Sequence, residues 1–113
     1  MFELLRLKMQ NELDKQIRNA KYRKETLKCF IPIFIKYRVK YAYLFGSVLR
    51  GKCKESSDID LYVEKICDKD FWKFLRELKK ISPYDIDIYT QSDDKNFIMK
   101  IKQRGIKIYE AQH

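Results

Sequence analysis

Two aspartates separated by one apolar residue are the side chains of this sequence best suited to chemistry. Asp58 and Asp60 alternate with Ile59 and Leu61, and this alternation predicts a β-strand with one polar and one apolar face. In a strand, residues two apart point to the same face and lie about 6.5–7 Å apart. The two carboxylates would repel each other there, and a cation such as Mg²⁺ or Mn²⁺ would relieve that repulsion. Taken alone, the pair also fits a solvated edge strand.

A second alternating segment, Tyr84–Tyr89, offers a third carboxylate. Asp85 and Asp87 alternate there with Ile86 and Ile88, so both acids would share one strand face. If this strand lies beside the first, Asp87 or Asp85 completes a carboxylate cluster in an otherwise basic chain. Three acids on two neighbouring strands match what two-metal phosphoryl or nucleotidyl transfer needs.

A Gly-Ser step that precedes the first aspartates is suited to hold phosphate. Tyr41–Phe45 is aromatic and short enough for a buried strand, and Gly46 allows a sharp turn after it. The next residues predict one or two helical turns that end at Gly51. The free N–H groups at the start of that helix and the Ser47 hydroxyl would face a phosphate. Arg50 flanks this turn and could support the phosphate.

Together these motifs resemble the minimal nucleotidyltransferases of the DNA polymerase beta superfamily. That family has a Gly-Ser turn, an Arg-Gly pair that closes the short helix, a Ser-Asp-x-Asp strand and a later third acid. The matching residues here are Gly46, Ser47, Arg50, Gly51, Ser57, Asp58, Asp60 and Asp87. The resemblance covers about residues 41–109 and favours Asp87 over Asp85, because Ile-Tyr-Thr follows Asp87 as it does in the family. The sequence departs from the family at Leu49, where a small residue is usual.

The resemblance implies an α/β (α+β) fold, with a small mixed sheet flanked by helices. The length of 113 residues predicts one domain over residues 1–113, with a helical N-terminal part at 1–36 and the catalytic core at 41–109. The implied reaction transfers a nucleoside monophosphate, AMP from ATP in the simplest case, to an acceptor hydroxyl with the help of two Mg²⁺ or Mn²⁺ ions. The implied catalytic and metal-binding residues are Asp58, Asp60 and Asp87, with Asp85 as second candidate, and the implied nucleotide-binding residues are Gly46, Ser47, Arg50 and Ser57. Stand-alone members often act as antitoxins that add AMP to a tyrosine of a HEPN-type ribonuclease, so such a partner is expected.

Helical periodicities occur in the sequence before and after these motifs. Apolar residues at positions 2, 5, 9, 13 and 17 predict a helix over 2–20, whose stripe either packs on the edge of the core or contacts a partner or a second copy. A second pattern over 25–36 contains Pro32, which predicts a kink or a helix restart. Residues 71–80 predict an amphipathic helix with Trp72 in the core, and a crossover between two strands of one sheet. A last helix, capped by Ser92 or Asp93, should end at Gly105 before a strand over 106–109.

Composition limits the class of protein. The 113 residues are 45% hydrophobic and 36% charged, which is typical of a soluble globular protein. No apolar run approaches the ~20 residues that a membrane-spanning helix needs, and charges interrupt the N-terminus too early for a signal peptide. Three widely spaced cysteines suggest neither a disulfide framework nor a zinc site and fit a reducing cytoplasm. The only histidine is His113, so acid–base chemistry should depend on carboxylates.

The net charge of +9 leaves alternatives open. It could attract a polyanion such as a nucleoside triphosphate or RNA, or it could reflect a lysine-rich solvated surface. The basic residues are dispersed and form no arginine-rich block, so RNA binding is possible but not favoured. A module that holds a nucleotide or a partner protein without turnover is the other alternative to an enzyme.

Overall fold

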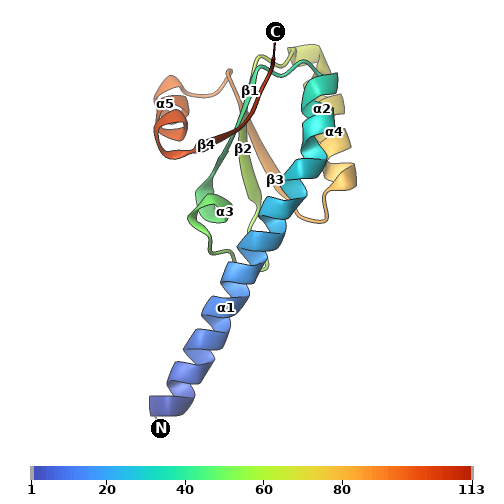
Figure 1. Ribbon diagram of the computed structural model, residues 1–113. Helices are drawn as coiled ribbons and strands as arrows, with labels where there is room; N and C mark the ends of the chain where they lie inside the picture. Colours follow the sequence, from blue (N-terminus) through green and yellow to red (C-terminus); the bar gives the residue numbers. More distant parts are fainter. Residues whose placement is uncertain (1, 113) are drawn as a thin grey trace.

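The structure, a computed structural model, describes residues 2–112 and is built on a mixed four-stranded sheet (Figure 1). In chain order the elements are α1 (Phe2–Thr26), η1 (Leu27–Phe30), α2 (Ile31–Lys36), β1 (Tyr41–Phe45), α3 (Gly46–Arg50), β2 (Ile59–Glu64), η2 (Asp68–Asp70), α4 (Phe71–Ile81), β3 (Ile86–Thr90), α5 (Lys95–Arg104) and β4 (Ile106–Glu110). The strand order is β3-β2-β1-β4. β1 pairs antiparallel with β2 and β4, whereas β2 and β3 are parallel. The expected fold class is confirmed.

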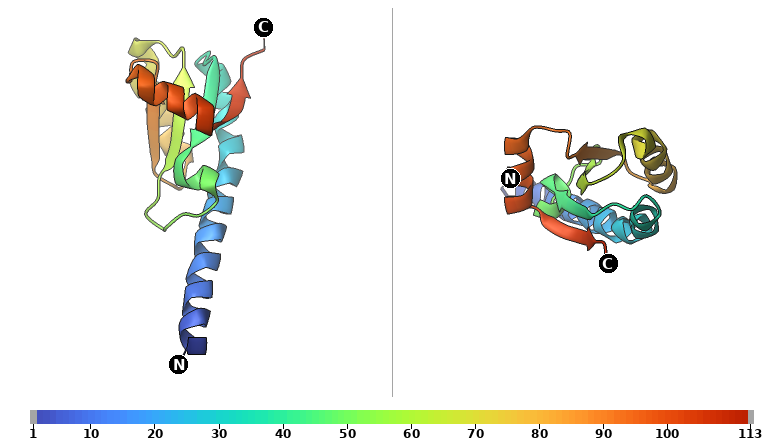
Figure 2. Two further views of the ribbon diagram at one scale, coloured as in Figure 1. Left: turned by 90° about the vertical axis from the view of Figure 1, so that its left-hand side faces the viewer. Right: turned by 90° about the horizontal axis from the view of Figure 1, so that it is seen from above.

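The two faces of the sheet have different tasks. Helices α2 and α4 cover one face, and α5 lies on the other (Figures 1 and 2). On the first face, alternate apolar residues of the strands pack into one core with Phe34 of α2 and with Phe74 and Leu78 of α4. The other face carries Asp60 and the fully buried Tyr62 of β2. The first face therefore carries the main core, and Asp60 lies on the second face among aromatic side chains.

The crossover from β2 through α4 to β3 forms as predicted, and it makes these two strands parallel neighbours. The helix caps differ in detail. Asp94, not Ser92 or Asp93, caps α5 by accepting a hydrogen bond from the Phe97 N–H. The prediction that Trp72 lies in the core is wrong, because its side chain is 70% exposed. Trp72 falls outside the helix face that carries the buried residues of α4.

Helix α1 is longer than predicted, and only part of it packs on the domain. Its first half projects away from the sheet (Figures 1 and 2), and the molecule measures 58 × 30 × 23 Å. Phe2 and Met9 are 81% and 65% exposed, whereas Ala20 is buried. Of the two expected roles of the apolar stripe, packing on the core edge is therefore excluded for the projecting half, and contact with a partner or a second copy stays a prediction. After α1, Pro32 occupies the first turn of α2, which confirms the predicted helix restart.

Two general features complete the architecture. None of the helices within residues 2–112 has the length and apolar character needed to cross a membrane. The three cysteines are free, with Cys53 buried and the other two exposed. His113, the sole histidine of the sequence, lies outside the described residues, as does Met1.

Candidate active site

Parallel pairing of β2 and β3 brings the predicted carboxylates together. The register places Asp60 of β2 directly beside Asp87 of β3. Asp58 immediately precedes β2, and burial together with its interaction with the Asp87 carboxyl raises the pKa of Asp58. Asp85 immediately precedes β3, where its carbonyl oxygen accepts a hydrogen bond of 2.9 Å from the Ile59 N–H. The cluster therefore consists of Asp58, Asp60 and Asp87, with Asp85 at its margin.

The carboxyl of Asp87 disfavours the ionisation of Asp58 and Asp60. Burial, followed by the hydrogen bond with Asp87 and the charge on Asp87, raises the pKa of Asp58 above its ordinary value. Burial and then the charges of Asp87 and Asp58 raise the pKa of Asp60 to about 6, and Arg50 only partly opposes them. Asp85 is not among the charges that act on either group. Three acids thus occupy one small region with a deficit of positive charge.

This donor set fits a divalent cation. Oxygen ligands suit Mg²⁺ and Mn²⁺, and no basic side chain among residues 2–112 forms an ion pair with these aspartates. Within the same residues, no three acidic, histidine or cysteine side chains converge closely enough to enclose an ion alone. An ion held here would complete its shell with water and substrate phosphates, which is the usual arrangement for Mg²⁺.

The Gly-Ser turn lies against this cluster. Gly46 has a φ of +78°, and a Cβ at this position would clash with the Asp60 carboxylate. Glycine is therefore required both by the backbone conformation and by the close approach of the acid. Ser47 follows at the start of α3, where its hydroxyl accepts a weak hydrogen bond of 3.6 Å from the Cys53 thiol. Gly51 ends α3 in the left-handed conformation, as predicted.

Ser57 helps to shape the loop that leads into β2. Its hydroxyl accepts a hydrogen bond of 2.9 Å from the Lys54 N–H, and its own N–H donates to the Lys54 carbonyl. This places Ser57 beside Asp58 as part of a tight turn. The Ser57 hydroxyl therefore has its hydrogen-bond partner, the Lys54 N–H, within this turn.

Sequence reasoning missed Arg23, which anchors the same loop from α1. Its side chain is only 4% exposed, and its guanidinium donates to the carbonyls of Ser57, Glu55 and Asn19 at 2.9–3.1 Å. The guanidinium also lies over the ring of Tyr84, 4.3 Å from its centroid. Arg23 thus ties α1 to the loop before Asp58 and to the residues before β3. Its position in the sequence could have indicated that Arg23 is buried, because it comes three residues after Ala20 and four before Leu27, on the inward face of the helix.

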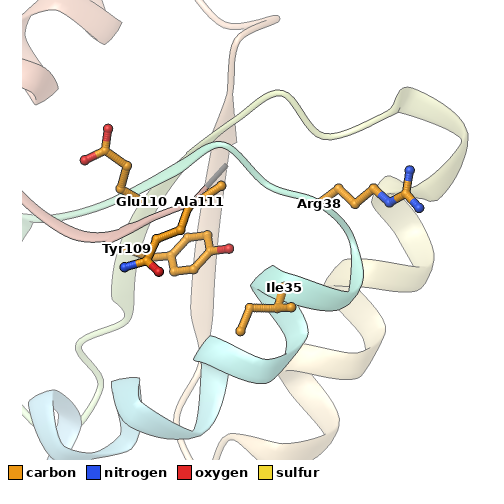
Figure 3. Close-up of a pocket in the computed structure, with 6 residues that line it drawn as sticks. Ile35, Arg38, Tyr109, Glu110 and Ala111 are labelled. Atoms are coloured by element: carbon orange, nitrogen blue, oxygen red, sulfur yellow. The ribbon is translucent and has the colours of Figure 1, made fainter.

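A groove of about 640 Å³ opens beside the carboxylates, between α3 and α5. Its lining residues are Phe45, Gly46, Leu49, Arg50, Asp60, Phe97, Lys100, Ile101 and Arg104. The α5 residues of this groove were not among the predicted site residues. A larger cavity of about 740 Å³ lies elsewhere, between α2 and β4, where Ile35, Arg38 and Tyr109 line it (Figure 3). That cavity is remote from the aspartates, so the groove beside Asp60 is the candidate substrate site.

Comparisons with known proteins identify the family of this chain. The family model described as "Polymerase beta, Nucleotidyltransferase" matches residues 28–113. A protein of Methanocaldococcus jannaschii named "Putative protein adenylyltransferase MJ0435" is 40% identical over 63 residues, which cover 53% of this chain and 68% of the relative.

Solved structures show the same fold. A mutant of the toxin–antitoxin complex MntA–HpeT aligns with a TM-score of 0.64 and 19% identity, over 75% of this chain and 73% of that chain. A toxin–antitoxin complex with AMP-PNP aligns with a TM-score of 0.62 and 22% identity, over 73% and 71%. The matched family model includes the aspartates, the Gly-Ser turn and α5, and it begins after α1. From the glycine turn to the last strand, this chain is a nucleotidyltransferase of the polymerase beta family.

Proposed function

We propose that this nucleotidyltransferase moves AMP from ATP to a hydroxyl group of an acceptor protein. The observation that carries the proposal is the placement of Asp60 beside Asp87, with Asp58 next to both and no paired basic residue among residues 2–112. The M. jannaschii relative is named as a protein adenylyltransferase, and one structural neighbour is a complex with AMP-PNP. Both support an adenine nucleotide and a protein acceptor.

The roles of the side chains follow from their positions. Asp58 and Asp60 would hold two Mg²⁺ or Mn²⁺ ions, and Asp87 would share one of them. When bound, these ions stabilise negative charge on the α-phosphate and on the leaving pyrophosphate. Gly46 and Ser47 would hold phosphate oxygens at the start of α3, with Arg50 in support. Ser57 would keep the loop in place before Asp58.

The transfer itself is a displacement at phosphorus. The acceptor oxygen bonds to the α-phosphorus of ATP, and the bond between that phosphorus and the bridging oxygen to the β-phosphate breaks. Pyrophosphate leaves with the electron pair of that bond. The proton of the acceptor hydroxyl passes to the carboxylate of Asp87, which is placed across from Asp60.

The test is label transfer from ATP carrying ³²P at the α-phosphate, with Mg²⁺ and a host lysate as the source of acceptors. Wild-type protein should label a protein band, and the Asp58→Asn plus Asp60→Asn variant should not. Asp68→Asn, an exposed acid outside the site, is the matched control and should label as wild type does. Label on RNA instead of protein, or equal labelling by the double variant, would contradict the proposal.

The acceptor that we propose is a tyrosine of a HEPN-type partner protein, which makes this chain an antitoxin. The projecting half of α1 offers a contact surface, because Phe2, Leu4, Leu5, Leu7 and Met9 are 55–81% exposed and exposed apolar clusters mark interaction sites. A second copy of this chain is the other possible occupant. Light scattering of the purified chain distinguishes them, and Leu5→Glu with Met9→Glu should abolish whichever complex forms. If this double variant weakens neither a dimer of the chain nor a complex with the partner protein, the projecting half of α1 is not a contact surface.

A further inference from the structure

Helix α5 turns basic side chains toward the groove beside Asp60. Phe97, Lys100, Ile101 and Arg104 are spaced by three and four residues, so they share one face of the helix, and all four line the groove. A helix that packs on a sheet normally directs apolar residues inward. Phe97 and Ile101 do so, but Lys100 and Arg104 lie on the same side. Both cations are exposed, so they line the groove without packing into the core.

Another lysine of α5 shows what a structural cation looks like here. Lys102 lies outside the groove and forms an ion pair of 2.8 Å with Glu64. In contrast, Lys100, Arg104 and the Arg50 of α3 form no ion pair within residues 2–112. Three basic side chains around one groove repel one another, and they create a positive potential that attracts an anion.

The groove combines acidic and basic lining. Asp60, beside which bound cations would hold a phosphate, lines the groove together with the basic side chains of Arg50, Lys100 and Arg104. The volume of about 640 Å³ is suited to a small ligand. A nucleoside triphosphate fits a groove with this lining, because its α-phosphate would react beside the carboxylates and its β- and γ-phosphates carry most of the negative charge.

We propose that α5 forms one wall of a polyphosphate site, in which Lys100 and Arg104 bind the β- and γ-phosphates of the nucleoside triphosphate while Arg50 contacts them from α3. The inference rests on the proposed function and adds α5 to its site. Because AMP lacks both of these phosphates, α5 makes the chain prefer ATP over AMP. After transfer, the same side chains hold pyrophosphate until it leaves.

Titration calorimetry on the full chain tests this with AMP-PNP, AMP and inorganic tripolyphosphate, each in the presence of Mg²⁺. Charge-assisted hydrogen bonds are worth about tenfold each in affinity. Lys100→Gln and Arg104→Gln should therefore each weaken AMP-PNP binding about tenfold, with a larger loss in the double variant. Binding of AMP should stay within about twofold of wild type. Tripolyphosphate should compete with AMP-PNP in wild type and compete poorly in the double variant.

Lys95→Gln is the matched control, because Lys95 is an exposed lysine on the same helix and does not line the groove. It should bind both nucleotides as wild type does. Lys100 and Arg104 are exposed, so circular dichroism should show folded variants. Wild-type protein that binds no AMP-PNP would overturn both the proposed function and this site. Wild-type binding that the double variant retains, or an equal loss of AMP and AMP-PNP, would overturn the α5 site alone.

Discussion

The two ends of β2 carry carboxyl groups on the same face of the sheet, and the surroundings of these groups shift their pKa values in opposite directions. Glu64 accepts hydrogen bonds from Lys102 and from the Tyr62 hydroxyl at 2.8–2.9 Å. Burial works in the opposite direction, but these bonds lower the pKa of Glu64 below its ordinary value. Asp60, four residues earlier, faces two other acids, and burial with their charges raises its pKa to about 6. The fold pairs Glu64 with Lys102, whereas it pairs no basic side chain within residues 2–112 with the Asp60 cluster.

The largest difference between Asp60 and Glu64 is expected when each carboxylate is removed. Asp60→Asn should reduce AMP transfer by about 10³-fold or more, because a metal-binding carboxylate contributes several kcal/mol to the transition state. Glu64→Gln should leave the transfer rate close to wild type and should lower the free energy of unfolding by about 1 kcal/mol, because a partly exposed ion pair is lost. Transfer rates and urea unfolding of both variants are the measurements. A strong loss of transfer in Glu64→Gln would remove the distinction between the two ends.

Asp85 and Asp87 allow the same kind of comparison at β3, between two acids that are only two residues apart. Asp87→Asn should abolish transfer nearly as fully as Asp60→Asn, since Asp87 lies directly beside Asp60. Asp85→Asn should retain activity within about threefold, because an exposed acid at the margin of a site makes a weak contribution. If Asp85→Asn is inactive and Asp87→Asn is active, the assignment of the third carboxylate must be reversed.

Arg23 tests whether the loop before Asp58 must be held in one position. Arg23→Met removes three hydrogen bonds to backbone carbonyls, so the loop before Asp58 should shift. Because a displacement of about 1 Å in a catalytic group costs on the order of 10²-fold in rate, AMP transfer should slow by about that factor. Arg23→Lys should restore little, because an ammonium group lacks the planar fork of donors. Transfer kinetics should be measured well below the unfolding temperature of each variant. Arg18→Met, on the exposed side of the same helix, is the control, and an unchanged kcat in Arg23→Met would assign Arg23 to stability alone.

Local pattern was sufficient to predict the strands and the proximity of Asp60 to Asp87, whose roles in catalysis stay a prediction. The alternation around Asp60 and Asp87 fixes which side chains share a face, and the β2–α4–β3 crossover then makes the strands parallel neighbours. Gly46 and Gly51 were likewise predictable, because both adopt positive φ at the ends of a short helix. These features depend on residues close together in the sequence.

What could not be predicted depends on how helices are placed on the sheet. The periodicity of α5 gave its apolar face, but only the packed structure places Lys100 and Arg104 in the groove that Asp60 also lines. Arg23 and Ser57 are 34 residues apart, so nothing in the local sequence links them. The stripe on α1 predicts a buried helix face equally well whether the cover is this domain or another chain, and the structure leaves its first half exposed.

The smallest expected effect concerns the stability of the metal-free protein against pH. Because the pKa of Asp60 is higher in the folded state than in the unfolded chain, folding is favoured when Asp60 is protonated, and this advantage is lost as pH rises from about 4 through about 6. Glu64 shows the opposite sign, since its lowered pKa gives stability that is lost as pH falls through that pKa. In EDTA at pH 7, Asp60→Asn should therefore be more stable than wild type, by about 1 kcal/mol after allowance for solvent screening. At pH 4 the difference should vanish, and for Glu64→Gln the loss of stability should be larger at pH 7 than at pH 4. Urea unfolding at the two pH values measures both, and an Asp60→Asn variant less stable than wild type at pH 7 would mean that the cluster is already neutralised by the fold.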